Sequence, residues 1–160
     1  MSVSVQQADF DAGAEIAMLS NGREEVGAVA SFVGLVRADK VLEPVGAGAT
    51  AAVRAMTLEH YPGMTEKALE AIVTEARGRW DIYDVRVIHR VGRLLPGDRI
   101  VLVAVASAHR GEAFAACEFI MDYLKTRATF WKKEETPEGG RWVDARESDD
   151  HAAGRWESGR

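Results

Sequence analysis

The sequence predicts an α+β fold with a mainly antiparallel sheet. Short segments rich in β-branched residues mix with helical periodicities without strict strand–helix alternation, and turn sequences join neighbouring strands. The chain has 160 residues, of which 47% are hydrophobic and 28% charged, as is usual for a globular protein. We assign residues 1–150 to one domain and expect the charged segment 151–160 to fray.

The first 60 residues contain three predicted strands and one predicted helix. The strands show β-branched or alternating apolar residues and span 3–10, 27–36 and 53–60. The helix spans 11–20 and ends at Asn21-Gly22. The Gly-rich segment 42–52 predicts a flexible loop inside the domain.

Residues 62–80 form the clearest predicted helix. Leu69, Ile72 and Ala76 recur at helical spacing, and Pro62 stands near the start, where its missing N–H costs nothing. The remaining predicted elements, in chain order, are strands 82–91 and 98–106 around the turn sequence Leu-Pro-Gly-Asp, a helix 111–128, and a hairpin of 130–136 with 141–144.

The composition excludes several classes of protein. Asp and Glu outnumber Lys and Arg by 25 to 20, for a net charge of −5, which argues against nucleic-acid binding. No run of 18 apolar residues and no secretory signal occurs, so we expect no membrane contact and a cytoplasmic location. The single cysteine, Cys117, excludes an internal disulfide and a Cys-rich metal site. With no metal-ligand cluster and no nucleotide-binding fingerprint, we predict no cofactor.

Lys125 is the first candidate for chemistry. At helical spacing it falls at the edge of an apolar stripe that comprises Phe114, Cys117, Ile120, Met121 and Leu124. An ammonium beside a core is partly desolvated, which lowers its pKa and suits it to acid–base or nucleophilic work. The alternative is a lysine whose stem covers apolar surface while its charge stays in water.

Lys132 is the second candidate. Alternation along a strand places Phe130, Lys132 and Glu134 on one face and Lys133 on the other. If the first face packs beside the helix end, Lys125 and Lys132 converge, and two ammonium groups close together indicate an anion between them. The alternative is two unrelated surface lysines or cations that offset the helix dipole.

Further cations stand at two ends of predicted elements. His109 and Arg110 open the second long helix, where free N–H groups attract anions and an arginine offers a fork for phosphate. Arg37 follows the end of an apolar strand. The alternative is that His109 or Ser107 is an ordinary helix cap. Together these residues predict a site for an anionic small molecule.

Six strings of the sequence resemble the family of molybdopterin synthase large, catalytic subunits and together cover nearly the whole chain. They are FVGLVR (32–37), TLEHYPGMTEKAL (57–69), VIHRVGRLLPGD (87–98), SAHRGEAF (107–114), FIMDYLKTRATFWKKE (119–134) and TPEGGRWVDARESD (136–149).

The resemblance implies an α/β hammerhead-like fold with an added β-hairpin, and a sulfurtransferase of molybdenum cofactor biosynthesis. Enzymes of this family insert two sulfurs, as a dithiolene, into cyclic pyranopterin monophosphate (precursor Z). The sulfur donor is the thiocarboxylate on the C-terminal Gly-Gly tail of a small ubiquitin-like subunit. Two large subunits form a central homodimer with a small subunit at each end, which makes a heterotetramer.

The family's functional positions match this sequence residue by residue. The resemblance implies Lys125 as the catalytic lysine, with Lys132 as the second. The other substrate-binding positions that it implies are Leu35, Val36, Arg37, His109, Arg110, Lys133, Glu134 and Arg146. The sequence departs from the family in the longer segment 38–52, at Thr129, where proline is common, and at Lys133, where arginine is common.

Two other functions remain open at the level of sequence. The chain can be a non-catalytic scaffold for a ubiquitin-like sulfur carrier, although docking a tail does not need so many cations. It can also be a sulfurtransferase that carries a persulfide on Cys117, although a cysteine in an apolar helical stripe has a raised pKa and is a poor nucleophile.

Overall fold

The computed structural model describes residues 2–38, 55–136, 139–143 and 147–157. The predicted loop 42–52 and the candidate Arg146 lie outside these ranges. The described helices are α1 (Ala12–Ser20), α2 (Met64–Arg79), α3 (Arg110–Arg127) and α4 (Glu147–Glu157). The described strands are β1 (Val3–Gln6), β2 (Ala28–Leu35), β3 (Ala55–His60), β4 (Ile82–Arg90), β5 (Gly92–Leu94), β6 (Arg99–Ser107), β7 (Phe130–Thr136) and β8 (Gly139–Val143).

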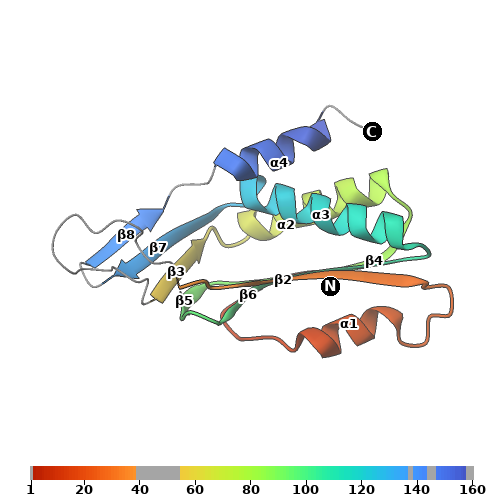
Figure 1. Cartoon of the computed structure of the whole chain (residues 1–160), viewed down its shortest axis with the longest axis horizontal. Helices are drawn as coiled ribbons and strands as arrows, with labels where there is room; N and C mark the ends of the chain where they lie inside the picture. Colours follow the sequence, from red (N-terminus) through yellow and green to blue (C-terminus); the bar gives the residue numbers. More distant parts are fainter. Residues whose placement is uncertain (1, 39–54, 137–138, 144–146, 158–160) are drawn as a thin grey trace.

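The described strands form two four-stranded sheets, with the orders β1-β4-β6-β2 and β5-β3-β7-β8. The β1–β4 pair is parallel, and the other pairs are antiparallel. The predicted α+β class and the predicted hairpin, now β7–β8, are therefore confirmed. Helices α2 and α3 cover one face of the first sheet and α1 covers the opposite face, while the second sheet extends from one end (Figure 1).

Local signals set the start of α1 and the end of β4. Asp11 caps α1, because its Oδ1 accepts a hydrogen bond of 3.0 Å from the backbone N–H of Ala14. Gly92 has a φ of 87°, which glycine adopts without strain, and it marks the step from β4 in the first sheet to β5 in the second. The three-residue strand β5 is not among the predicted elements, since a run this short has no periodicity to detect.

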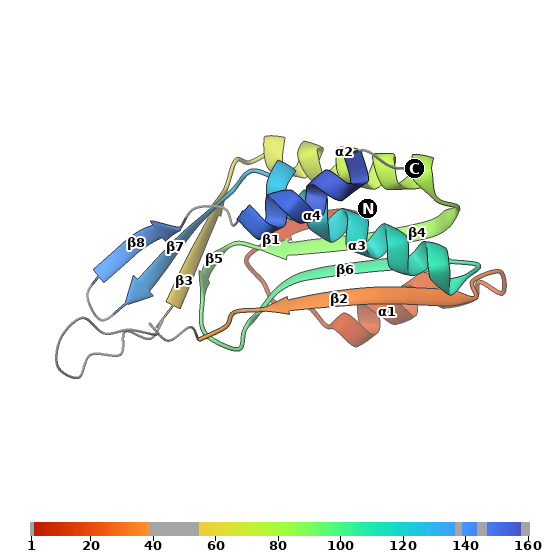
Figure 2. The ribbon, with the colours of Figure 1, turned by 45° about the horizontal axis from the view of Figure 1, so that its top comes forward.

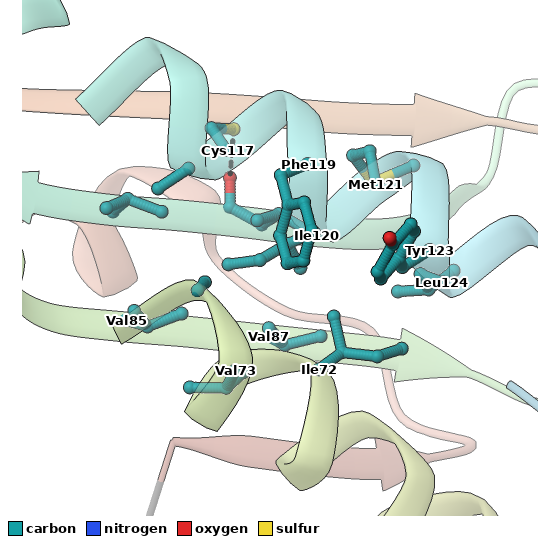
Figure 3. Close-up of a cluster of buried hydrophobic side chains, with 14 of the residues drawn as sticks. Ile72, Val73, Val85, Val87, Cys117, Phe119, Ile120, Met121, Tyr123 and Leu124 are labelled. Carbon is teal, nitrogen blue, oxygen red and sulfur yellow. Dashed lines mark hydrogen bonds between the residues drawn. The ribbon is translucent and has the colours of Figure 1, made fainter. Parts of the chain in front are cut away.

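The main core lies between the first sheet and helices α2 and α3 (Figure 3). The buried face of α3 includes four of the five predicted stripe residues, namely Cys117, Ile120, Met121 and Leu124. Phe114, the fifth, is 64% exposed, so its predicted burial is wrong. The side of α3 that faces the sheet is continued instead by Ala113 and Ala116, whose small side chains let the helix approach closely.

The C-terminal segment forms α4 where the sequence suggested a frayed tail from residue 151, and this expectation is corrected for the described residues up to 157. Ala153 is buried, and the indole Nε1 of Trp156 donates a 2.6 Å hydrogen bond to Asp122 on α3. The Trp156 ring also meets Trp80 edge to face at 5.5 Å. These contacts stabilise a segment whose charged composition, viewed alone, favours disorder.

Candidate active site

Lys125 and Lys132 stand on either side of a short connection between α3 and β7. Lys125 lies in the last turn of α3, Ala128 is extended (φ −81°, ψ 141°), and β7 begins at Phe130. Only Ala128 and Thr129 separate the two elements. The positions of the two lysines relative to each other therefore depend on how this connection, residues 128–130, is held.

Thr65 holds the connection from the start of α2. The side chain of Thr65 is fully buried, and its hydroxyl donates a 2.8 Å hydrogen bond to the backbone carbonyl of Thr129. The same hydroxyl accepts a 3.0 Å bond from the backbone N–H of Tyr61. Because Thr129 contributes only its carbonyl to this contact, the contact does not depend on whether position 129 is threonine or the proline common in the resembling family.

His89 holds the connection from the end of β4. Its ring is 4% exposed and stacks on the ring of Phe130, with the centroids 3.8 Å apart and the planes 19° from parallel. Its Nδ1 lies 2.8 Å from the carbonyl of Arg90. Burial lowers the pKa of His89 to about 4, against the effect of the Arg90 hydrogen bond, and the nearby charges of Lys125 and His60 lower it further. His89 is thus neutral at pH 7.

The stack also defines which way Lys132 faces. Phe130 turns toward His89, whose electrostatic surroundings include Lys125. Side chains two positions apart share a face of a strand, so Lys132 lies on the same face of β7 as Phe130, about 7 Å further along. Lys132 is half-buried and pairs in register with Leu58 of β3 and Val143 of β8. His89 is therefore near enough to Lys125 to feel its charge, and it stacks on the face of β7 that also carries Lys132.

Lys125 itself is exposed in the single chain, so the predicted partial desolvation by this chain's own core is not observed. Phe114 precedes it by eleven residues, about three helical turns, and both side chains lie on the outer side of α3. The expected position of Lys125 at the edge of the core depended on a buried Phe114, and Phe114 is exposed.

A histidine–carboxylate pair lies next to the stack. His60, the last residue of β3, pairs in register with Phe130, and its Nε2 lies 3.6 Å from Oε1 of Glu66. The other carboxylate oxygen of Glu66 accepts a 2.7 Å hydrogen bond from the N–H of Gly63. Oε1 of Glu66 is enclosed without a hydrogen-bond partner.

Arg37 lies two residues after the end of β2, and hydrogen bonds fix the backbone just before it. The N–H of Val36 donates to the carbonyl of Asp98 at 2.9 Å, and the carbonyl of Val36 accepts from Gly97 at 2.8 Å. Gly97 has a φ of 91°, as the predicted turn requires. The side chain of Val36 is buried among residues of β3 and β5, whereas Leu35 and Arg37 are exposed. Val36 thus anchors the segment, and its two neighbours are the residues presented to solvent.

His109 and Arg110 lie at the opposite end of α3 from Lys125. Sixteen residues separate His109 from Lys125, which corresponds to about 24 Å along a helix, and Figure 2 shows the two ends of α3 far apart. Both residues are exposed. Neither alternative cap is formed: the His109 side chain makes no capping hydrogen bond, and the Ser107 hydroxyl donates 2.8 Å to the carbonyl of Asp81. One chain alone does not bring these residues to the two lysines.

Lys133, Arg127 and Glu134 have surroundings that differ from those of Lys125 and Lys132. Lys133 lies on the face of β7 opposite Lys132, and its Nζ is 5.7 Å from the ring centre of exposed Trp142. Arg127 stacks over Tyr123 at 3.7 Å and forms ion pairs with Glu75 and Glu157. The backbone of Glu134 lies in β7, opposite Met56 and Arg141.

Cys117 lies deep in the core and is a poor sulfur carrier. Its side chain is 6% exposed, and its Sγ is 3.7 Å from the carbonyl of Val103. Burial, and secondly the charge of Glu118, raises the pKa of Cys117 to about 12. The thiolate is the nucleophilic form of cysteine, so the structure argues against the persulfide alternative.

Within the described part of the chain, no three His, Cys, Asp or Glu side chains gather into a group that could hold a metal ion. None of the described helices is both long enough and apolar enough to cross a membrane.

Comparisons with known proteins agree with one another. The model of the MoaE protein family matches residues 5–127. The molybdopterin synthase catalytic subunit of Ralstonia nicotianae is 63% identical over 155 residues, which cover 97% of this chain and 84% of that protein. The solved structure of the molybdopterin biosynthesis MoaE protein from Burkholderia ambifaria is 56% identical, with a TM-score of 0.79 over 99% of each chain. A chain from the complex of subunits 1 and 2 of molybdopterin-converting factor from Helicobacter pylori is 17% identical and shares the fold, with a TM-score of 0.70 over 91% of this chain and 92% of that one.

Proposed function

The chain belongs to the MoaE protein family of molybdopterin synthase catalytic subunits, and we propose that it carries out the sulfur transfer that forms molybdopterin. Precursor Z receives two sulfur atoms as a dithiolene, and each sulfur comes from the C-terminal thiocarboxylate of a small ubiquitin-like subunit. In each transfer the thiocarboxylate sulfur bonds to precursor Z, and a water molecule then cleaves the acyl–sulfur bond, so that the donor tail is left with a carboxylate. The observation that carries this proposal is the pair Lys125 and Lys132 on either side of a connection that Thr65 and His89 hold.

The two lysines have different proposed roles. Lys125 polarises or deprotonates the reacting group as the thiocarboxylate attacks, which is general acid–base work. Lys132 stabilises the negative charge that develops on the substrate. Their placement supports this division: Lys125 is exposed at the end of α3, where an incoming tail can reach it, and Lys132 is half-buried on the strand beside it. No resident cofactor is proposed, because the sulfur arrives already activated on the partner.

Arg37 is the proposed contact for the phosphate of precursor Z. A guanidinium offers a planar fork that matches phosphate oxygens, and the backbone before Arg37 is fixed through Val36. Leu35 is 56% exposed and offers an apolar surface for the pterin. Lys133, Glu134 and Arg146 remain proposed contacts on the family resemblance alone.

A homodimer resolves the separation of His109 and Arg110 from the lysines. β2 is an edge strand of the first sheet, and Phe32, Val33 and Leu35 on it are exposed. An exposed apolar edge strand favours pairing with a second copy. If two β2 strands pair about a two-fold axis, they run antiparallel, so the end of one lies beside the start of the other.

This pairing would bring His109 and Arg110 of one copy toward Arg37 of the other. Gly27, just before β2, donates to the carbonyl of Ser107 at 3.0 Å, which ties the start of β2 to the start of α3. The eight residues of β2 span about 25 Å, close to the separation of His109 from Lys125. β2 and α3 run in the same direction (Figure 2). His109 and Arg110 of one copy are therefore brought toward Arg37 of the other copy.

The proposed partner is a small ubiquitin-like subunit whose Gly-Gly tail ends beside Lys125, so that the full assembly is a heterotetramer. The fold shared with a chain of the two-subunit Helicobacter pylori complex supports such a partner. Truncation of the partner's two terminal glycines should abolish activity while much of the docking surface remains. We also propose a cytoplasmic location, because a chain with a single cysteine suits a reducing compartment.

Reconstitution tests the proposed function. The purified chain is incubated with precursor Z and with the thiocarboxylated partner, and molybdopterin is measured. We expect product only when all three are present, and none with a partner that ends in an ordinary carboxylate. A chain that binds the partner but forms no molybdopterin would establish the scaffold alternative instead.

A further inference from the structure

His89 is a buried polar residue that the proposed reaction does not use. It lies near the end of β4, and its strand neighbours Val87 and Ile88 are apolar and buried. Burial of an imidazole is costly unless its polar atoms are satisfied. A leucine or valine would fill such a position at lower cost, so the presence of His89 calls for a reason beyond packing.

The contacts of His89 fix the state of its ring. A carbonyl oxygen only accepts hydrogen bonds, so the 2.8 Å contact with Arg90 requires the proton on Nδ1. The neutral ring therefore carries its lone pair on Nε2. This hydrogen bond limits rotation of the ring, and the Phe130 ring lies nearly parallel to it at 3.8 Å. The His89 ring is thus held in place by its own strand, and Phe130, the first residue of β7, packs against it.

Phe130 connects the His89 ring to the two lysines. Its backbone N–H donates to the carbonyl of Ala128 at 3.1 Å, which tightens the chain just after the helix that carries Lys125. Two residues later on the same face of β7 stands Lys132. A shift of the Phe130 ring therefore moves the start of β7 relative to the end of α3, and a displacement of 1 Å at a reacting group can cost about 100-fold in rate.

We propose that His89 is a positioning residue for the sulfur transfer: its ring holds Phe130 and thereby sets the position of Lys132 relative to Lys125. The inference rests on the proposed function for its effect on rate, but not for its effect on geometry. His89 touches neither substrate nor partner in this account and acts only through Phe130.

Three substitutions separate the contribution of the ring stack on Phe130 from that of the hydrogen bond to Arg90. His89→Phe keeps an aromatic ring for the stack and loses the hydrogen bond to Arg90. His89→Asn keeps a donor for the Arg90 carbonyl and loses the ring. His89→Leu loses both and keeps an apolar side chain of similar size. Ile88→Ala is the matched control, because Ile88 immediately precedes His89 in β4, is 1% exposed, and packs in the separate cluster under α1.

The first measurement is single-turnover sulfur transfer, made well below each variant's melting temperature, with titrations of precursor Z and of the partner. We expect His89→Leu and His89→Asn to be at least 10-fold slower, with both affinities within about 3-fold of the parent. His89→Phe should recover most of the rate, and Ile88→Ala should stay within about 2-fold even though it melts earlier. A rate for His89→Leu that equals that of Ile88→Ala, or a better recovery by Asn than by Phe, would overturn the proposal.

The second measurement does not need turnover. Lysines are reductively ¹³C-methylated, and the NMR signals of Lys125 and Lys132 are assigned with Lys125→Arg and Lys132→Arg. His89→Leu should move the Lys132 signal, whereas His89→Phe and Ile88→Ala should leave it in place. An unmoved signal in His89→Leu contradicts the positioning role even if the parent makes no molybdopterin, and that latter result would refute the proposed function separately.

Discussion

The hydroxyl of Thr65 donates a 2.8 Å hydrogen bond to the carbonyl of Thr129 and so ties the start of α2 to the connection between the two candidate lysines. The two residues are 64 positions apart in the sequence. This bond and the His89–Phe130 stack hold the connection from two independent elements, and each can be tested separately.

Thr65→Val should lower both stability and sulfur transfer. Valine has nearly the same shape but cannot bond to the Thr129 carbonyl or the Tyr61 N–H, which are both partners of the fully buried Thr65 side chain. We expect a loss of roughly 1–3 kcal/mol in the free energy of unfolding. The control is Thr74→Val in the same helix, where the exposed hydroxyl bonds only to the carbonyl of Glu70, and its effect should stay within about 0.5 kcal/mol. Denaturant unfolding of both variants measures the difference, and equal losses would contradict the importance of the bond.

Cys117→Ser should leave sulfur transfer nearly intact. The sulfur that is transferred belongs to the partner, and the serine hydroxyl can still donate to the Val103 carbonyl that now lies beside Sγ. The measurement is molybdopterin formation with the thiocarboxylated partner. Loss of turnover in a variant with normal melting and normal partner binding would revive the persulfide mechanism.

Two inactive variants should restore each other if the site is shared between copies. Lys125→Ala and Arg110→Ala each disable both sites of a homodimer. Random exchange of subunits makes half of the dimers mixed, and each mixed dimer has one site free of both substitutions, so about a quarter of the parent activity should return. The measurement is molybdopterin formation after the two variants are unfolded and refolded together. If mass spectrometry detects mixed dimers but activity does not return, the two copies do not share a site. Arg110 and Lys125 then belong to the same chain's site or to no common site.

Stability should fall on acidification through His89. Burial is the chief cause that lowers the pKa of His89 from its ordinary value of 6.5 to about 4 in the folded state. Between these values the unfolded chain binds a proton that the folded chain does not, so stability is lost as pH falls from 6.5 to about 4 and the loss then levels off. The slope from this group is at most about 1.4 kcal/mol per pH unit. Lys125 and His60 oppose the proton as well.

The comparison with His89→Phe isolates this effect. Asp9 and Glu25, whose pKa values are lowered chiefly by hydrogen bonds, are present in both proteins, so their contributions cancel. The melting temperature of the parent should drop more between pH 7 and pH 4.5 than that of His89→Phe. Parallel pH dependences would show that His89 is not held neutral by the fold.

Elements with local signals could be predicted from the sequence, and elements that depend on distant partners could not. The Asp11 cap and the turn around Gly97 follow from neighbouring residues. The burial of α4 depends on Trp156 meeting Asp122 and Trp80, which lie 34 and 76 positions away. The exposure of Phe114 could not be predicted, because its hydrophobicity suggests burial, whereas the buried side of α3 is continued by small alanines.

The candidate site shows the same division. Lys125, Lys132 and Arg37 could be found from charge, strand alternation and element ends, together with family motifs. The positioning of Lys132 through His89 could not be predicted. Nothing in the sequence of β4 indicates that His89 stacks on Phe130, a residue 41 positions later. The separation of His109 from Lys125 was predictable, since sixteen helical residues span about 24 Å. Only the strand order, which leaves β2 at an edge, indicates how a second copy can close that gap.

Single-turnover sulfur transfer by Lys125→Ala tests whether Lys125 is the catalytic lysine. It is measured beside a precursor Z titration, a partner titration and a thermal melt, with Lys67→Ala, an exposed lysine of α2, as the control. We expect a rate loss of about 10²–10⁴-fold with little change in melting or in either affinity, whereas Arg37→Ala should chiefly weaken binding of precursor Z. A Lys125→Ala rate within a few-fold of the parent would show that Lys125 is an ordinary surface lysine, and the catalytic assignment would pass to Lys132.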